Sequence, residues 1–180
     1  AADVAAILEE FYLRFYGEAA QPMRAWHETL EKQMVDCGVH MPGNAPSYAH
    51  HVFTRKVRKR LKELVAEAQD LARDPLVARR IERMAVQTDY ADRFAEIVTL
   101  RHEAITDTGP TRREKLERGR ALYRELRAEV SGNPEKYFGI MDADRLSMGI
   151  CKRMIDDMER RLEGVDGDGA QIQAADEALL

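Results

Sequence analysis

The sequence predicts an all-α protein, a bundle of five to six amphipathic helices with one long loop. Charged residues make up 33% of its 180 positions and aromatic residues only 7%, a balance that favours helices with solvated faces over sheets. Apolar residues also recur at the three- and four-residue spacing of a helix face along most of the chain. A chain of this length normally forms one domain, and we expect residues 1–164 to form it and residues 165–180 to be a polar tail.

Composition disfavours two classes of partner. The formal net charge is −4 and the isoelectric point is near 5.8, so the chain has no overall attraction for nucleic acid or for an anionic membrane. No apolar run approaches the roughly 18 residues that cross a bilayer, and no signal-peptide pattern is present. We therefore expect a soluble piece, cytoplasmic or secreted according to what precedes Ala1. Cys37 and Cys151 are expected to be free thiols rather than a disulfide.

The N-terminal segment predicts two helices joined by a tight corner. Asp3 is a suitable N-cap for the first helix, and Gly17 suits the left-handed position that ends it. The second helix follows with Pro22 in its first turn, where proline is tolerated, and ends near Cys37. Five of the aromatic residues crowd into these two helices: Phe11, Tyr12, Phe15, Tyr16 and Trp26. Two interpretations stay open, because these rings can all belong to the core of the bundle or can partly face a neighbouring domain.

Residues 37–51 predict a long loop. The stretch CGVHMPGNAPSYAHH holds two prolines and two glycines and shows no helical period. Loops of this length are uncommon unless they are functional or disordered. Metal binding is disfavoured, because no set of four well-spaced ligands accompanies the histidines. The candidates for contacting a ligand or another domain are instead His40, Tyr48, His50 and His51.

Two further helices follow the loop. The helical period resumes near Val52 and runs to the break at Asp74 and Pro75, the expected N-cap and first residue of the next helix. That helix is the longest, ends before Gly109, and spaces its inward residues like a coiled-coil seam. The seam consists of Val77, Ile81, Met84, Thr88, Ala91, Ala95, Val98, His102 and Ile105. We interpret its two most polar members, the threonine and the histidine, as hydrogen-bonded core residues.

The C-terminal third predicts a fifth and a sixth helix. Thr111 and Glu114 have the S/T-x-x-E spacing of a capping box, which opens a helix that Pro134 brings to an end. The sixth helix runs from about Asp142 to Gly164. The core expected from all six helices is Leu8, Phe11, Trp26, Leu30, Leu61, Leu64, Ile81, Met84, Phe94, Val98, Tyr123, Leu126, Ile150 and Met154.

Two kinds of charged motif have a functional and a structural interpretation. Residues 55–62 hold six cations and could contact nucleic acid, but the cations flank apolar positions on both sides, so we favour a solvated helix face. The carboxylate pairs Asp89–Asp92 and Asp156–Asp157 could serve acid–base chemistry. Nothing apolar nearby would separate their pKa values, however. We therefore predict no catalytic residue, no cofactor and no metal site in this chain.

Two stretches resemble a known family. ADVAAILEEFYLRFYGEAAQPMRAWHETLE, residues 2–31, and LKELVAEAQDLARDPLVARRIERMAVQTDYADRF, residues 61–94, resemble the helical region that follows the barrel in a broad family of bacterial glycoside-hydrolase-like proteins. The positions that carry the resemblance are Asp3, Phe11, Phe15, Tyr16, Gly17, Ala19, Ala20, Pro22, Asp74, Pro75, Arg79, Arg80, Ile81 and Glu82. In such proteins the barrel carries the catalytic carboxylates. A chain of 180 residues without alternating strands cannot supply that barrel, so no catalytic residue is carried over.

The resemblance implies an accessory helical domain, C-terminal to a carbohydrate-active barrel and involved in carbohydrate metabolism. Such a domain would stabilise the barrel, contact a carbohydrate only through it or through the 37–51 loop, and be inactive alone, with the parent protein as the candidate glycoside hydrolase. The first residue, Ala1 rather than methionine, favours a preceding leader or domain. Two alternatives stay open: a free-standing interaction protein that dimerises through an exposed apolar face, and a small helical enzyme that uses the histidine-bearing loop.

Overall fold

The computed structural model describes residues 3–39, 48–107 and 109–163, and these residues form helices and turns without a strand. The prediction of an all-α fold is therefore confirmed. His40 and the predicted tail lie outside the described residues. Cys37 and Cys151 are free thiols, as predicted, and Cys151 is buried.

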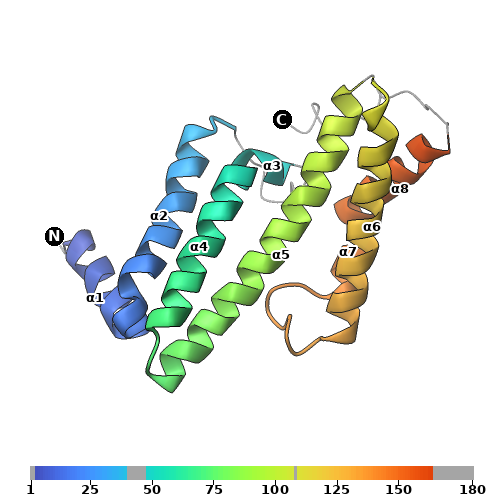
Figure 1. Cartoon of the computed structure of the whole chain (residues 1–180). Helices are drawn as coiled ribbons and strands as arrows, with labels where there is room; N and C mark the ends of the chain where they lie inside the picture. Colours follow the sequence, from blue (N-terminus) through green and yellow to red (C-terminus); the bar gives the residue numbers. More distant parts are fainter. Residues whose placement is uncertain (1–2, 40–47, 108, 164–180) are drawn as a thin grey trace. The chain divides into compact units, whose positions relative to one another are not determined.

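The described residues divide into two compact units, which comprise residues 3–39 with 51–92 and residues 48–50 with 93–107 and 109–163. The first unit contains α1 (Val4–Tyr16), the 3-10 turn η1 (Gly17–Ala19), α2 (Ala20–Asp36), α4 (Arg55–Leu71) and the first part of α5 (Pro75–Thr106). The second contains the rest of α5, α6 (Thr111–Gly132), α7 (Ala143–Leu146) and α8 (Gly149–Leu162). The short α3 (Ala49–Val52) has residues in both units. Figure 1 labels these helices.

Local capping sets the helix ends of the first unit as the sequence predicts. The Asp3 carboxylate accepts hydrogen bonds from two backbone N–H groups in the first turn of α1, at 3.0 and 3.4 Å. Gly17 ends α1 with a φ of 50°, a conformation that favours glycine. The Asp74 carboxylate accepts from two backbone N–H groups at the start of α5, at 2.7 and 3.1 Å. These caps satisfy backbone donors that a helix end leaves unpaired.

The core of the first unit lies where α2 packs against α4, with α1 on the other side of α2 (Figure 1). Its buried members are Tyr16, Ala19, Ala20, Met23, Trp26, Val57, Leu61, Leu64, Val65, Ala68, Val77 and Ile81. The seam residue Thr88 is buried and accepts a hydrogen bond from the Trp26 indole at 3.1 Å. The interpretation of Thr88 as a hydrogen-bonded core residue is therefore confirmed.

The core of the second unit forms where α6 packs against α7 and α8. Gly119 lets α6 come close to α8, since a Cβ at this position would lie only 3.2 Å from Met158 Sδ. The buried Tyr123 hydroxyl of α6 donates a hydrogen bond to the backbone carbonyl of Leu146 at the end of α7. Close packing thus joins α6 to α8, and one buried hydrogen bond joins α6 to the short α7.

Two predicted details of the second unit are wrong. Thr111 is not an N-cap, because α6 is preceded by Pro110, which offers no side-chain hydrogen bond, and the Thr111 hydroxyl donates to Asp107 at 2.6 Å instead. The predicted sixth helix is two helices, because α7 ends at Leu146 and α8 begins at Gly149, whose φ is 57°. The apolar spacing continues across this break, so periodicity alone could not reveal it.

Most of the predicted core residues are buried: Trp26, Leu61, Leu64, Ile81, Phe94, Val98, Tyr123, Leu126 and Met154. Leu30 and Met84 are partly buried, and the side chain of Ile150 is outside the described part of the chain. Leu8 and Phe11 were predicted wrongly, since 47% and 45% of their surfaces are exposed. The physical reason is that α1 packs on α2 through a different edge, the one that carries its tyrosines.

Candidate functional site

The first helix carries an exposed apolar surface, which we call the α1 apolar face and define as Val4, Ile7, Leu8, Phe11 and Phe15. Their exposed fractions are 66, 54, 47, 45 and 37%, in that order. The spacing of these positions places them along one side of the helix. Isolated exposed apolar residues are normal, but a contiguous strip of them marks a surface that contacts another molecule or domain.

Two interactions order the C-terminal end of the α1 apolar face. The rings of Phe11 and Phe15 stack, with centroids 5.3 Å apart and an interplanar angle of 18°. The Arg80 guanidinium of α5 lies over the Phe15 ring, 4.2 Å from its centroid, and donates a hydrogen bond to the Phe15 carbonyl at 2.7 Å. Side chains that are ordered before binding lose less entropy on association, so this end of the face is prepared for a partner.

The tyrosine edge of α1 packs on α2. Tyr16 is buried and Tyr12 is half-buried, and their ring centroids lie 6.5 and 5.8 Å from that of His27. Glu9 forms an ion pair with Arg24 of α2 at 2.5 Å. Burial raises the pKa of both tyrosine hydroxyls and lowers the pKa of the His27 imidazole. This edge therefore holds α1 against α2, while the α1 apolar face remains exposed.

The five aromatic candidates divide between surface and core. Phe11 and Phe15 belong to the α1 apolar face, Tyr12 and Tyr16 pack on α2, and Trp26 is a core residue of the first unit. The two pairs on α1 are each spaced by four residues, so each pair lies on its own side of the helix. Sequence reasoning missed that the aliphatic residues earlier in α1 are exposed together with the phenylalanines. A helical projection of residues 4–16 was the signal that could have separated the two sides.

The loop candidates do not converge on one site in the described residues. His40 lies outside them, and Tyr48 is half-buried immediately before α3. His50 and His51 lie within α3 rather than in an irregular loop. The backbone carbonyl of His51 accepts a hydrogen bond from Gln33 Nε2 of α2 at 3.0 Å. The part of α3 that carries His51 is therefore anchored to α2.

His50 belongs to the second unit and has an unexpected neighbour within it. Its ring stacks on the ring of His102, with centroids 4.3 Å apart. His102 is exposed, so its interpretation as a core residue of the seam is wrong. The adjacent Arg101 is only 9% exposed and takes the inward position, where it binds a buried carboxylate. Among the described residues, no group of three or more His, Cys, Asp or Glu side chains is arranged to hold a metal ion.

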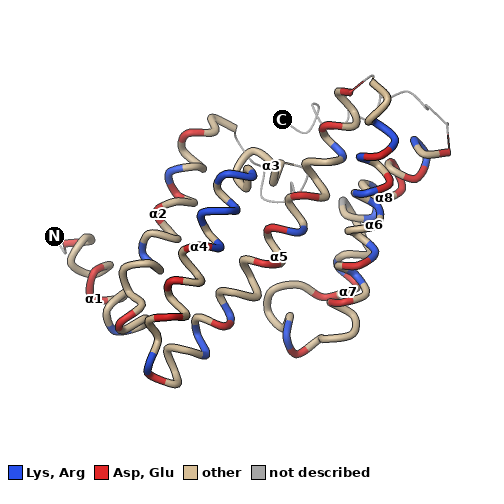
Figure 2. Tube along the Cα trace, in the orientation of Figure 1, with Lys and Arg blue, Asp and Glu red and all other residues tan. Residues whose placement is uncertain are grey.

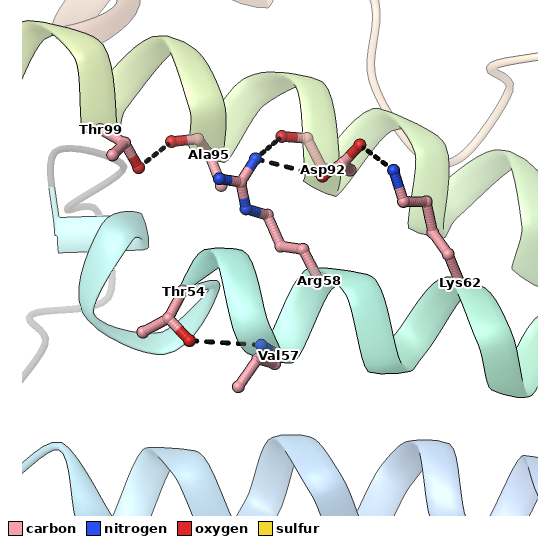
Figure 3. A network of polar contacts seen from close by, with 7 residues as sticks. All are labelled: Thr54, Val57, Arg58, Lys62, Asp92, Ala95 and Thr99. Carbon is pink, nitrogen blue, oxygen red and sulfur yellow. Dashed lines mark hydrogen bonds and ion pairs between the residues drawn. The ribbon is translucent and has the colours of Figure 1, made fainter.

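The Asp92 carboxylate binds two cations from α4, as Figure 3 shows. Arg58 Nη1 donates to the Asp92 carbonyl oxygen at 2.8 Å and to its Oδ1 at 3.1 Å, and Lys62 Nζ donates to Oδ2 at 2.7 Å. Arg58 is only 4% exposed. The prediction that the basic run 55–62 is a solvated face is therefore wrong at this position. The other five cations of the run are exposed, and Figure 2 shows the basic positions along α4 in blue.

The second candidate carboxylate pair is also bound by cations. Asp157 is buried between Arg101 and Arg161, at 2.9 and 3.0 Å, and Asp156 pairs with Lys152 on the surface of α8. The two carboxylate oxygens of Asp157 each accept a hydrogen bond from one of these guanidinium groups. Asp157 is therefore a structural residue of the core, and we assign it no acid–base role.

A hollow in the second unit lies at the start of α6. Three of its lining side chains are arginines, Arg112, Arg113 and Arg161. Arg161 shares the Asp157 carboxylate with Arg101, and Arg113 pairs with Glu117 at 3.0 Å. Carboxylates of the same unit therefore already bind two of the three arginines, which makes the hollow a weaker candidate than the α1 apolar face.

Comparisons with protein-family models, with curated proteins and with solved structures find no match to this chain. The resemblance to the helical region of glycoside-hydrolase-like proteins therefore stays a prediction. No helix among the described residues is both long enough and apolar enough to cross a bilayer. The α1 apolar face is the site for which the structure offers the most direct support.

Proposed function

We propose that this chain is a helical accessory domain that docks onto a neighbouring folded domain through the α1 apolar face. The observation that carries the proposal is the exposure of five apolar side chains on one side of a helix that is fixed to its unit by the other side. Exposure of this kind is costly in water unless another surface covers it.

The size of the face fits a complete interface. On average about half of each of the five side chains is exposed. At roughly 200 Å² for a large apolar side chain, the face presents on the order of 500 Å² of apolar surface. A stable interface covers about 800 Å² per partner, of which about 60% is apolar. The α1 apolar face is therefore large enough to supply the apolar part of one interface.

The partner that we propose is a glycosidase-like barrel. The stretch that resembles the helical region of glycoside-hydrolase-like proteins, residues 2–31, includes the whole of α1, so the resemblance and the exposed face lie on the same segment. A (β/α)₈ barrel is surrounded by helices, and a helix with anchors at i, i+3, i+4 and i+7 suits the groove between two such helices. In this arrangement the barrel supplies any catalysis.

Dimerisation is the competing function. The structure does not support the surface on which the sequence placed the dimer interface. The seam of α5 was its expected surface, but Val77, Ile81, Thr88, Ala95 and Val98 are all buried in the chain. We therefore place the competing dimer interface on the α1 apolar face as well. The two functions compete for one surface, which makes them separable by experiment.

The test compares the isolated chain with the protein encoded by the complete reading frame. We expect the amides of α1 to exchange more slowly in the complete protein, because docking covers the face. The double change Val4→Glu with Ile7→Glu affects the two most exposed residues of the face. It should abolish this protection while it alters the stability of the isolated chain by less than about 0.5 kcal/mol. Leu13→Glu is the matched control, since Leu13 is 53% exposed on the same helix but away from the face.

Two results would overturn the proposal. One is equal exchange of α1 in the complete protein and in the isolated chain. The other is that the isolated chain sediments as a dimer and that the double glutamate change dissociates this dimer. That result would favour the competing function. A reading frame that encodes a folded domain other than a barrel would overturn the choice of partner alone.

A further inference from the structure

His27 lies at the contact between α1 and α2, in an aromatic cluster. Its ring centroid is 5.8 Å from that of Tyr12, 6.5 Å from that of Tyr16 and 4.9 Å from that of Trp26. Its Nε2 atom is buried and has no hydrogen-bond partner among the described residues. A buried, unpaired polar atom is unusual enough in proteins to require a physical explanation.

We infer that His27 is a pH-sensitive latch, whose protonation releases α1 from α2. The role of the latch as a regulator of docking rests on the proposed function, because α1 carries the docking face. The release itself is a property of this chain alone and can be measured without a partner.

The chemistry of the imidazole supports the latch. A neutral imidazole has one N–H donor and one acceptor, whereas an imidazolium has two N–H donors and a positive charge. Protonated His27 would thus hold a charged N–H at Nε2 with no acceptor nearby, which is costly in a buried place. Since Tyr12 and Tyr16 come from α1, departure of α1 would expose the ring to water and remove that cost.

The charged groups around His27 do not remove the cost of protonating its buried ring. Both tyrosines of α1 are uncharged at neutral pH, and burial raises their pKa values further. Glu28, Glu31 and Arg24 of α2 act on Tyr12, and Arg80 of α5 acts on Tyr16. The two carboxylates would favour an imidazolium, yet burial dominates and lowers the pKa of His27.

Apart from its contact with His27, α1 is held by few interactions, and one of them is the Arg80 guanidinium of α5 on the exposed Phe15. Only Tyr16 of α1 is fully buried. The ion pair between Glu9 and Arg24 is about 40% exposed on both sides, and exposed pairs contribute little to stability. Segments with few buried contacts open at low free-energy cost without global unfolding.

The direction of the pH effect follows from the lowered pKa. The attached state of α1 binds fewer protons than the released state, so attachment is fully stable above the ordinary pKa of 6.5 and weakens as the pH falls below it. If the attached state excludes the proton, the equilibrium constant for release rises about tenfold between pH 7.5 and pH 5.5.

The experiment uses the 180-residue chain and two NMR measurements. A titration of the His27 ring should give a pKa below 6.5. Amide exchange, divided by the intrinsic rate at each pH, should show that protection in α1 falls by threefold to tenfold between pH 7.5 and pH 5.5. Protection in α4, measured in the same samples, should stay constant.

Variants separate the latch from a general effect of acid. His27→Gln and His27→Phe should each remove the pH dependence of α1 protection. Two variants are used so that the test survives if one of them fails to fold. His102→Gln is the matched control and should keep the wild-type response. The inference is wrong if the fall is less than threefold, if either folded His27 variant keeps it, or if α1 is unprotected already at pH 7.5. None of these results bears on docking, which is measured with the complete protein.

Discussion

The indole Nε1–H of Trp26 donates a hydrogen bond to the Thr88 hydroxyl at 3.1 Å, and this buried contact joins α2 to α5 within the first unit. Trp26 is 4% exposed and Thr88 is 3% exposed. Each residue thus gives the other a partner in a place that water does not reach, which is the usual condition for a buried indole.

This contact predicts how the first unit responds to substitution. Trp26→Ala should lower the free energy of unfolding by about 3–5 kcal/mol, because it leaves a large cavity. Trp26→Phe keeps most of the ring volume but removes the donor, and should couple to Thr88→Val by about 1 kcal/mol in a double-mutant cycle. Urea unfolding followed by circular dichroism measures both, since fluorescence would lose the only tryptophan of the chain. A coupling energy of zero would show that the hydrogen bond contributes nothing.

The two cations that bind the Asp92 carboxylate should contribute differently to the free energy of unfolding, because one is buried and the other is exposed. The Arg58 side chain is 5% exposed and that of Lys62 is 52% exposed, and both bind Asp92 (Figure 3). Arg58→Met should lower the free energy of unfolding by about 2–3 kcal/mol, because two hydrogen bonds from a buried guanidinium to the aspartate are lost. Lys62→Met, the matched control, should cost less than about 1 kcal/mol. Equal effects of the two changes would contradict this explanation.

Helix ends were predictable from the sequence where a local signal acts alone. Asp3, Gly17 and the Asp74–Pro75 pair set the ends of their helices through hydrogen bonds and backbone angles within a few residues. Thr111 had the same kind of signal and was predicted wrongly. Its hydroxyl is bound by Asp107, a residue outside the capping pattern, so a competing local partner decided the outcome.

The candidate site could be predicted only in part, because burial depends on tertiary contacts. The sequence identified Phe11 and Phe15 as candidates for packing on a neighbour, yet also placed Phe11 in the core. Periodicity shows that a helix has an apolar side but not which neighbour covers that side. In α1 the tyrosine edge packs on α2 instead, and the inward position of Arg58 among exposed cations was hidden for the same reason.

The hydrogen bonds of Glu129 in the second unit should weaken in acid. Its carboxylate accepts hydrogen bonds from Lys136 at 2.6 Å, from the Tyr137 hydroxyl at 2.7 Å and from Arg93. These three donors, led by Lys136, lower the pKa of Glu129 to about 2. The stabilisation is therefore fully present above the ordinary pKa of 4.5 and is lost as the pH falls from 4.5 towards 2.

The measurement for Glu129 compares the free energy of unfolding of the wild type with that of the Glu129→Gln variant. Wild type should be more stable to urea than Glu129→Gln at pH 7, and this gap should shrink steadily between pH 4.5 and pH 2. The exposed Glu125 lies on the same helix, so Glu125→Gln is the matched control and should show a small gap at every pH. A gap for Glu129→Gln that does not change with pH would mean that the carboxylate charge is irrelevant to the contact.

The last prediction is that the isolated chain hydrolyses no glycoside. Glycosidic hydrolysis normally needs two carboxyl groups across the scissile bond, one of them kept protonated by a raised pKa. The two carboxyl groups most strongly perturbed by their surroundings, Asp107 and Glu129, are shifted the opposite way, with pKa values lowered by hydrogen bonds. Asp92 and Asp157, members of the two pairs that the sequence suggested, are bound by arginine and lysine.

A panel of aryl glycosides and aryl uronides is the assay for this prediction. Turnover by the isolated chain that is abolished when one of its own carboxylates is replaced would contradict it. In the complete protein, alanine at the four loop candidates His40, Tyr48, His50 and His51 should raise KM or lower kcat without unfolding the helices, if the loop reaches the pocket of a barrel. A complete protein that is active and indifferent to all four replacements would restrict the chain to docking, because the α1 apolar face requires no contact with substrate.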